Sequence, residues 1–536
     1  MPEVLTVSDQ ECALGNELAA RREYQAALAH YDQALGRDPS HWPALVGRAA
    51  ALLHLGCIDE AISEGRRAVS ARPEDPIARI NLGTMLRSSD GLDESVAIFR
   101  SVTRDAPDNA HAWYGLGVGL LKQHRTSAGL RALERAIELH PNDPVALTAA
   151  ANAYYDLDQL GAAGDAYRRA AAADPGSLTA SNLARYLARV GALEEAEAMS
   201  STIIAHESRP LVCAQAHLNR ATVRFRAGRL ADAWDDYAYS WGIPDRKPNR
   251  ACAVSKWSGE PLAGKTLLVW GEQGVGDDIL LSSVFDDAIH AAQRVILEID
   301  PRLVPLFTRS FPDATVRARP PAEVCEAGTD DPGPIDYHCS TFDLAAQFRR
   351  SFDAFPSPER HLIADAARVK RWRSQLAQGD ELLVGFSWRS MRLTGDRKRL
   401  YSRLDQWGQV FAVPGVRFVN VQYDDCSAEL EAARSRFGVE LVVPSGVNLR
   451  DDFDETAAVL GALDLVIAPS NATSQLAAAI GIPTWELTDG HGFASLGTDH
   501  SPWRHSKSLR FLDEAAGWDG TLATIATDLA LLDQMR

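Results

Sequence analysis

Apolar and small residues in the first part of the chain recur with a period of 34 residues. Each period holds two stretches in which apolar residues return every three or four positions, the pattern of an amphipathic helix. A proline closes each period, and because proline lacks the amide hydrogen that a helix needs, it ends the second helix. The pattern predicts a series of helix pairs over residues 1–245, about seven in number. The closing prolines are Pro39, Pro73, Pro107, Pro141 and Pro175.

Small residues follow the same period. Two helices can cross closely only where small side chains let their backbones approach. After Pro175 the period loosens, because the next proline, Pro210, comes one residue late. We therefore expect the last two helix pairs to diverge from the others. The periodic small residues are Gly15, Ala49, Gly83, Gly117 and Ala151 in one register, and Ala27, Ala61, Ser95, Gly129 and Ala163 in another.

The aromatic residues of these repeats indicate a family. Tyr31, Phe99 and Tyr167 fall in the second helix of their pairs, and Trp113 and Tyr114 fall in the first helix of the fourth pair. These residues resemble the consensus of the tetratricopeptide repeat (TPR). The resemblance implies an α-solenoid whose concave surface binds extended protein segments.

From residue 262 onward the pattern changes to short apolar stretches separated by helical ones, after a polar, proline-containing linker at 246–261. Short strands that are apolar throughout are typical of parallel sheets covered on both faces. They form two groups, within 262–375 and 376–536. The predicted fold is thus an α-solenoid followed by two Rossmann-like α/β halves that face each other across a cleft, with ligands at the carboxyl ends of the strands. The predicted strands are 266–270, 294–299, 315–318, 382–386, 417–421, 441–443, 465–468 and 484–487.

The composition argues against several classes of partner. A net charge of −17 and a pI near 5.3 disfavour nucleic acids and anionic membranes, which attract basic surfaces. No apolar run reaches the roughly 18 residues that span a bilayer, and Met1 to Gln10 lacks the features of a secretory signal. The seven cysteines have no CxxC spacing, so we expect neither a zinc site nor a disulfide framework. A cytoplasmic protein without a bound metal or cofactor fits these features best.

The sharpest chemical motif is the glycine-rich stretch 270–277, Trp-Gly-Glu-Gln-Gly-Val-Gly-Asp, which joins a predicted strand to a predicted helix. Such a turn lets backbone N–H groups approach an anion or a sugar, and the helix N-terminus adds a favourable dipole. Its spacing differs from the GxGxxG dinucleotide motif, and Asp277 stands where a phosphate-binding loop needs lysine. Asp277 is either a functional carboxylate or a simple helix cap. The residues that shape the turn are Gly271, Gln273, Gly274 and Gly276.

This stretch resembles the start of the catalytic region in bacterial TPR-containing glycosyltransferases, which are relatives of the ADP-heptose lipopolysaccharide heptosyltransferases. Further matches follow in the same order at 384–389, 418–423, 452–467 and 476–485. The resemblance implies a GT-B fold whose first half carries the acceptor side and whose second half holds the nucleotide sugar. It places Asp277 at the position of the general base in an inverting, metal-independent sugar transfer.

On the donor side, the resemblance directs attention to two segments of the second half. Arg389 and Arg399 belong to a cation-rich loop that follows a predicted strand, where an arginine can grip a pyrophosphate with two hydrogen bonds. An ordinary solvated loop has the same composition. Glu486 ends a later strand and is the candidate acceptor for ribose hydroxyls.

The turn before the helix at 472–479 is the second donor segment. Its polar side chains can donate hydrogen bonds to a phosphate at the helix N-terminus, or can simply cap the helix. Many family members carry an aspartate and a histidine where this chain has Ser470 and Gln475, so its donor sugar or base can differ from the usual one. The candidate residues are Ser470, Asn471, Thr473 and Ser474.

These features predict a protein O-glycosyltransferase, because a long peptide-binding solenoid suits a protein acceptor better than a small glycan. By analogy with other TPR-containing glycosyltransferases, flagellin is the favoured acceptor, and a CMP-nonulosonic acid, a UDP-sugar or an ADP-sugar is the donor. Two alternatives stay open. One is a TPR scaffold whose glycosyltransferase module has decayed. The other is a glycosyltransferase that acts on lipopolysaccharide or surface polysaccharide.

Overall fold

The computed structural model divides the chain into two compact units, Met1–Leu187 and Ala188–Arg536. The helix pairs expected over 1–245 therefore extend across both units, because the helices after Leu187 belong to the second one. The structure describes residues 6–175, 178–243, 251–252, 254–272, 274–320, 324–325, 334–356, 360–391, 401–490, 493–504, 506–513 and 515–534.

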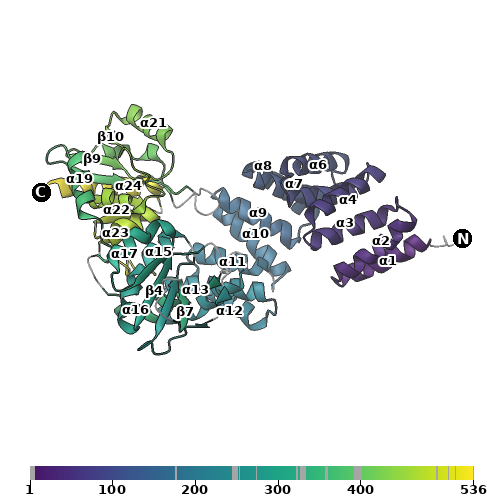
Figure 1. The fold of residues 1–536 in the computed structure, drawn as a ribbon. Coiled ribbons are helices and arrows are strands. Elements are labelled where there is room, and N and C mark those ends of the chain that lie inside the picture. Colours follow the sequence, from purple (N-terminus) through teal and green to yellow (C-terminus); the bar gives the residue numbers. More distant parts are fainter. Residues whose placement is uncertain are drawn as a thin grey trace. The chain divides into compact units, whose positions relative to one another are not determined.

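The first unit is a stack of antiparallel helix pairs, as the TPR pattern predicts (Figure 1). Each periodic proline lies two residues beyond the end of the second helix of its pair, as Pro39 follows Arg37. The helices are α1 (Val7–Ala20), α2 (Tyr24–Arg37), α3 (Trp42–His54), α4 (Ile58–Ala71), α5 (Pro76–Arg87), α6 (Leu92–Asp105), α7 (Ala110–Lys122), α8 (Thr126–Leu139), α9 (Pro144–Asp156), α10 (Leu160–Ala173) and α11 (Leu178–Arg189), the last of which crosses the boundary.

Aromatic rings packed on glycines explain why small residues keep the period. The Tyr31 ring fills the space in which a Cβ atom on Gly15 or Gly47 would lie, at 2.7 and 2.5 Å from ring atoms. The Tyr31 hydroxyl donates a hydrogen bond to Asn16 Oδ1 at 2.8 Å. Four periods later, the Tyr167 hydroxyl donates in the same way to Asn152 Oδ1 at 2.5 Å. The repeats thus share their contacts as well as their spacing.

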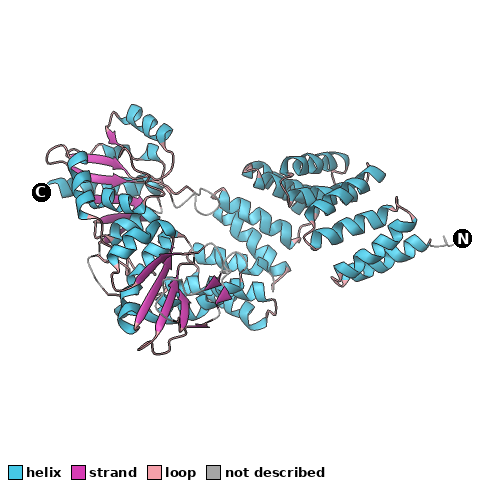
Figure 2. Cartoon of the chain, viewed as in Figure 1, coloured by secondary structure: helices cyan, strands magenta, loops and turns pink. Residues whose placement is uncertain are grey.

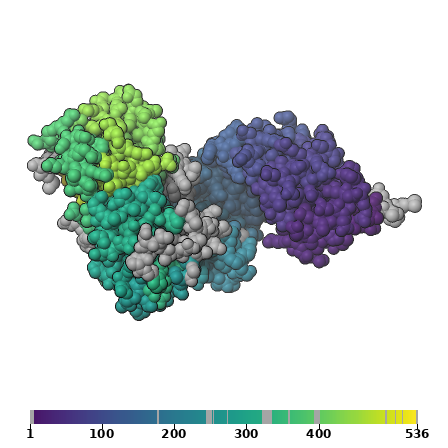
Figure 3. Space-filling model, in the orientation of Figure 1, coloured from purple at the N-terminus to yellow at the C-terminus, as the bar shows by residue number. Residues whose placement is uncertain are grey.

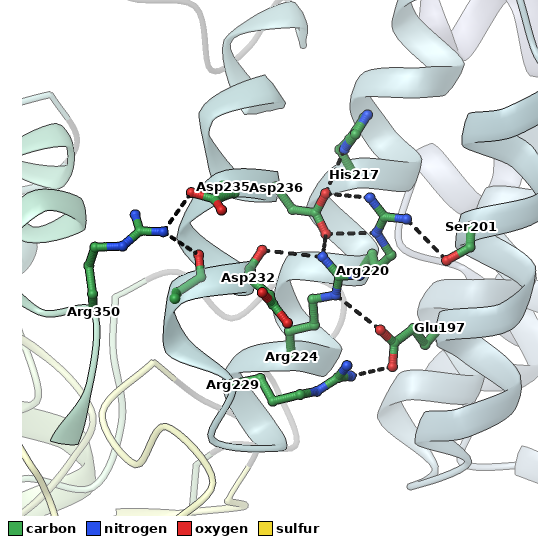
Figure 4. Close-up of polar contacts among 11 residues, drawn as sticks. Glu197, Ser201, His217, Arg220, Arg224, Arg229, Asp232, Asp235, Asp236 and Arg350 are labelled. Carbon is green, nitrogen blue, oxygen red and sulfur yellow. Dashed lines mark hydrogen bonds and ion pairs between the residues drawn. The ribbon is translucent and has the colours of Figure 1, made fainter. Parts of the chain in front are cut away.

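The second unit begins with α12 (Leu193–His206), α13 (Pro210–Arg226) and α14 (Leu230–Tyr237), followed by the 3-10 turn η1 (Ala238–Gly242). A network of ion pairs ties these helices together (Figure 4). At its centre the Asp236 carboxylate, 3% exposed, accepts hydrogen bonds from Arg220 at 2.7 Å and from Arg224 at 2.9 Å. Arg350, which follows α18 (Thr341–Phe348), donates to Asp235 of α14 at 2.9 Å and so links α14 to the first sheet half.

The first sheet has five parallel strands in the order β2-β7-β3-β4-β5. Strands are drawn in magenta in Figure 2. Three of them, β3, β4 and β5, have the bounds that the apolar pattern predicts, whereas the two-residue β2 was not among the predicted strands. The strands are β2 (Ser255–Lys256), β3 (Thr266–Trp270), β4 (Arg294–Ile299), β5 (Thr315–Ala318) and β7 (Tyr337–Ser340), and the helices are α15 (Val275–Leu281), α16 (Phe285–Ala291), α17 (Val304–Ser310) and α18 (Thr341–Phe348).

The second sheet has six parallel strands in the order β10-β9-β8-β11-β12-β13. In sequence order this is 3-2-1-4-5-6, the arrangement of a doubly wound nucleotide-binding sheet, in which ligands bind where the order reverses. That reversal lies between β8 and β11. The elements are β8 (Leu382–Phe386), β9 (Val416–Asn420), β10 (Leu441–Val442), β11 (Leu465–Pro469), β12 (Thr484–Thr488), β13 (Lys507–Phe511), α19 (Ala366–Leu376), α20 (Gly408–Phe411), α21 (Ser427–Phe437), α22 (Phe453–Gly461), α23 (Ala472–Ala479) and α24 (Gly517–Gln534).

One hydrophobic core links the two sheet halves, since it contains Val269 of β3 together with Val466 of β11. In the space-filling view the teal surface of the first half adjoins the green surface of the second (Figure 3). The short strands β1 (Ala251–Cys252) and β6 (Val324–Cys325) pair with each other, and this pairing bears on the expectation about disulfides. Cys252, which lies opposite Cys325 in this pairing, is disulfide-bonded, and spacing along the sequence could not reveal that proximity.

Candidate functional site

Two turns from different sheets meet at the junction of the halves. One follows β3 and opens α15, and the other follows β11 and opens α23. They approach so closely that a Cβ atom on Gly276 would lie 3.5 Å from the backbone nitrogen and Cα of Ala472. Because ligands of parallel sheets bind at the carboxyl ends of the strands, this junction is the candidate site.

Gly271 begins the first turn and has no room for a side chain. A Cβ atom there would lie 2.3 Å from Oδ1 of Asp278. The Gly271 N–H donates to the Glu298 carbonyl at 2.9 Å, and Arg319 donates to the Gly271 carbonyl. The glycine is therefore required by its neighbours within the fold, as well as by any ligand that approaches the turn.

Asp277 is half-buried in the first turn of α15, beside Gly276. Its Oδ2 accepts a hydrogen bond from the Gly274 N–H at 3.2 Å, so the carboxylate does cap the helix. A carboxylate that caps a helix is still a base, so this contact is compatible with a catalytic role. Gln273 lies outside the described residues.

Two further carboxylates of this turn have perturbed pKa values. Asp278 is completely buried, and burial raises its pKa to about 7 against the opposing effect of Arg319. Burial also raises the pKa of Glu272 well above its usual value, and the neighbouring Asp343 adds to that rise. Glu272 was not among the residues predicted from the sequence, although its position directly after a strand and a glycine could have indicated a functional residue.

Asn471 caps α23 in the second turn. Its Oδ1 accepts hydrogen bonds from the N–H groups of Thr473 at 3.0 Å and Ser474 at 3.1 Å, while its Nδ2 donates to Ser387 Oγ at 3.4 Å. These two N–H groups are already satisfied, so the structure favours the capping interpretation over phosphate binding by them. Ser470 is exposed at the edge of this turn. Ser387 directly follows β8 and so lies where the strand order reverses. It was not among the site residues predicted from the sequence.

Glu486 does not face a ligand, contrary to the expectation that it accepts from ribose hydroxyls. It is 0% exposed, and its Oε2 pairs with Lys507 Nζ at 2.8 Å. Ser474 and Gln475 also donate to Oε2, at 2.8 and 3.2 Å. Burial lowers the pKa of Lys507, and Glu486 opposes that shift. Gln475, at the position of the family's histidine, thus completes a buried polar network.

Arg389 is likewise engaged within the protein. Its guanidinium pairs with both Asp424 and Glu429, and these contacts raise its pKa above the usual value. Two carboxylates already occupy its donors, so in this arrangement it is not directed at a pyrophosphate. Arg399 lies outside the described residues.

Within the described ranges, no group of three or more His, Cys, Asp or Glu side chains is placed to hold a metal ion. Nor does that part of the chain contain a helix of the length and apolar character needed to cross a membrane.

Comparison with known proteins gives three findings. Residues 12–76 and 116–177 match the family model of the tetratricopeptide repeat. Protein FlbA of Caulobacter vibrioides is 30% identical over 521 residues, which cover 95% of this chain and 81% of that protein. The CTR9 homolog of Arabidopsis thaliana is 30% identical over 150 residues, which cover 27% of this chain and 14% of that protein.

Among solved structures, TTC0263, a thermophilic TPR protein of Thermus thermophilus, is 23% identical and has a TM-score of 0.31. It covers 34% of this chain, and the match covers 98% of that chain. The similarity to FlbA therefore extends through both sheets, whereas this structural similarity covers about a third of the chain.

Proposed function

The chain belongs to the family of protein FlbA. We propose that it is a glycosyltransferase that modifies a protein acceptor. The observation that carries the proposal is the meeting of the β3–α15 turn with the β11–α23 turn at Gly276 and Ala472. Two doubly wound sheets whose strand ends approach each other form a GT-B-like site, in which a donor and an acceptor can bind on opposite sides.

We assign the nucleotide sugar to the second half. The 3-2-1-4-5-6 order of its strands suits a nucleotide, and the reversal between β8 and β11 brings Ser387 and Asn471 together. The polar ends of these strands, with the exposed Ser470, would contact the donor. Arg389 is paired with Asp424 and Glu429, and Glu486 is paired with Lys507, which leaves the cation-rich segment that contains Arg399 as the candidate for neutralising the leaving phosphate.

We assign the acceptor and the catalytic base to the first half. In the proposed step, the Asp277 carboxylate takes the proton of a serine or threonine hydroxyl. The hydroxyl oxygen then bonds to the anomeric carbon of the sugar while the bond from that carbon to the phosphate oxygen breaks. The electron pair of that bond leaves with the nucleotide phosphate, so the transfer inverts the anomeric centre.

The repeats supply the reason to favour a protein acceptor. TPR stacks bind extended protein segments, and holding the acceptor raises its effective concentration at the sheets. Flagellin is the proposed acceptor by the analogy given above, and the proposed donors are a CMP-nonulosonic acid, a UDP-sugar or an ADP-sugar.

The test is incubation of the purified full chain with flagellin from the same genome and each class of donor, followed by intact-mass measurement. The proposal predicts a mass increase of one or more sugar residues with one donor class. The asparagine of Asp277→Asn keeps an oxygen that can cap α15. Its neutral amide cannot act as a general base, so transfer should slow by about 10²- to 10⁴-fold. Asp313→Asn, an exposed aspartate of the same half, is the control and should transfer normally.

The remaining outcomes separate the alternatives. Transfer to lipopolysaccharide but not to flagellin would refute the protein acceptor. Tight flagellin binding with no transfer from any donor would support a scaffold, an alternative that is favoured by the engagement of Arg389 with Asp424 and Glu429 and of Glu486 with Lys507. Transfer that survives Asp277→Asn would refute Asp277 as the base.

A further inference from the structure

Glu272 occupies the point where the strand order of the first sheet reverses. It follows β3 by two residues, and β3 lies between β4 on one side and β7 on the other. Trp270 at the end of β3 is in register with Ser340 at the end of β7, so Glu272 extends beyond this pair. This is the place at which a doubly wound sheet receives its ligand.

Among the residues that the structure describes, none donates a hydrogen bond to the Glu272 carboxylate. Both of its oxygens are buried, and neither meets the geometry of a hydrogen bond. Ser340 is close enough to favour the ionised form without meeting that geometry. The hydroxyl of Thr341, the next residue after Ser340, is also buried and lacks a partner. A buried, unsatisfied carboxylate costs stability, so its presence at a strand end indicates a group that a ligand completes.

The surrounding charges select the kind of ligand. Asp277 and Asp343 both lie near enough to Glu272 to raise its pKa, and Lys256 is paired with Asp343 at 2.8 Å. This setting repels a phosphate but suits neutral donors such as a hydroxyl or a backbone N–H. Of the two substrates, the neutral hydroxyl of the acceptor therefore suits this setting better than the phosphates of a nucleotide sugar.

The neighbours of this strand end also point to the acceptor. Trp241 of η1, the turn that ends the helices after the repeats, lies with its ring 6.5 Å from that of Trp270. The Trp270 ring in turn lies 6.4 Å from that of His338 in β7. Aromatic side chains thus connect the last helical turn to the strand that carries Glu272.

We propose that Glu272 is an acceptor-binding residue, whose carboxylate accepts a hydrogen bond from the acceptor hydroxyl and holds it beside Asp277. This inference rests on the proposed function, because it names the group that holds the substrate of that reaction. It differs from the role of Asp277, since Glu272 binds the hydroxyl and does not need to take its proton.

The test compares Glu272→Gln with the wild-type full chain and with Glu440→Gln, a glutamate whose side chain is 72% exposed on the other half. The first readout, urea unfolding, does not depend on activity. Removing an unpaired buried carboxylate should leave Glu272→Gln at least as stable as wild type. A lower stability would mean that the carboxylate is satisfied within the fold, and would overturn the inference.

The second readout is the kinetics of transfer to flagellin. Glutamine keeps one acceptor oxygen but is a weaker partner for the hydroxyl, which supports a rise in the acceptor KM of about 3- to 10-fold for Glu272→Gln, with little change in kcat. Glu440→Gln should behave as wild type. Equal KM values for Glu272→Gln and wild type would overturn the inference while leaving the proposed function intact, as would a loss confined to kcat. Failure of the wild type to transfer to any acceptor would instead refute the proposed function.

Discussion

Replacing Asp278 with asparagine should stabilise the unit Ala188–Arg536 at neutral and alkaline pH. Asp278 is completely buried, and its Oδ1 has no hydrogen-bond partner. Its Oδ2 accepts from the Asp300 N–H at 3.4 Å, which an asparagine oxygen can also do. The substitution therefore removes a buried charge and keeps the one hydrogen bond that is described.

The magnitude follows from the pKa. Burial raises the pKa of Asp278 to about 7, while Arg319 and the Asp300 N–H oppose the rise and the carboxylates of Asp277 and Asp300 add to it. In the unfolded chain an aspartate titrates near 3.9, so the folded chain binds the proton more tightly. The stability that this proton contributes is complete below the unfolded pKa and is lost as the pH rises through about 7. The full loss is about 4 kcal/mol at pH values above both pKa values.

Urea unfolding followed by tryptophan fluorescence is a suitable assay, because ten of the twelve tryptophans lie in this unit. The stability of Asp278→Asn minus that of wild type should grow by about 3 kcal/mol between about pH 5 and about pH 8, and then stay constant. The exposed Asp313→Asn should show no such trend. A difference that is independent of pH, or that shrinks as the pH rises, would refute the assignment of a raised pKa to Asp278.

Three further substitutions test the packing by unfolding measurements. Lys507→Met should destabilise the second unit by about 3–5 kcal/mol, because Glu486 is left buried and unpaired, and adding Glu486→Gln should restore part of the loss. Gly271→Ala should cost about 1–3 kcal/mol, since its Cβ would lie 2.3 Å from the Asp278 carboxylate; unchanged urea stability would contradict the turn geometry. Gly36→Ala, in α2 with open space around it, should instead stabilise the repeats by about 0.5–1 kcal/mol in thermal unfolding followed by helical circular dichroism.

The apolar pattern predicted most strands of the two sheets. β3, β4, β5 and β8 have the expected bounds, and β3 and β8 are mostly or wholly buried along their length. β13 was missed because it alternates buried and exposed positions and carries the buried Lys507. A lysine in a core strand is recognisable only when its partner, Glu486 of the adjacent strand β12, is known.

The residues of the candidate site fall into two groups. Some could be predicted from local sequence, and others depend on contacts between residues far apart in the sequence. Local chemistry placed Asp277 in a helix cap after a glycine turn, and it placed Asn471 in a second cap. The pairing of Arg389 with Asp424 and Glu429 depends on contacts across about 35 to 40 residues of sequence, which residue type and spacing do not encode. Glu272 lay within the motif, but only the alignment of β3 with β7 shows that no donor among the described residues reaches its carboxylate.

The helices that follow the repeats have a different role from the repeats themselves. Phe225 of α13 and Trp234 of α14 belong to the same hydrophobic core as Val269 of the first sheet and Val466 of the second.

Each of these two aromatic residues also contacts the sheet halves directly. The Trp234 indole donates to the Arg349 carbonyl at 2.9 Å, and the Phe225 ring packs edge-on against Phe493 at 5.2 Å. These helices therefore pack against both sheet halves. Phe225 and Trp234 are buried in that packing and are not available to bind an acceptor. A repeat fragment that ends at residue 245 would expose Phe225 and Trp234 and should aggregate, whereas one that ends at Leu187 keeps the unit Met1–Leu187 intact. Acceptor binding by the shorter fragment, measured by calorimetry with flagellin, is the sharper test of where the protein substrate is held.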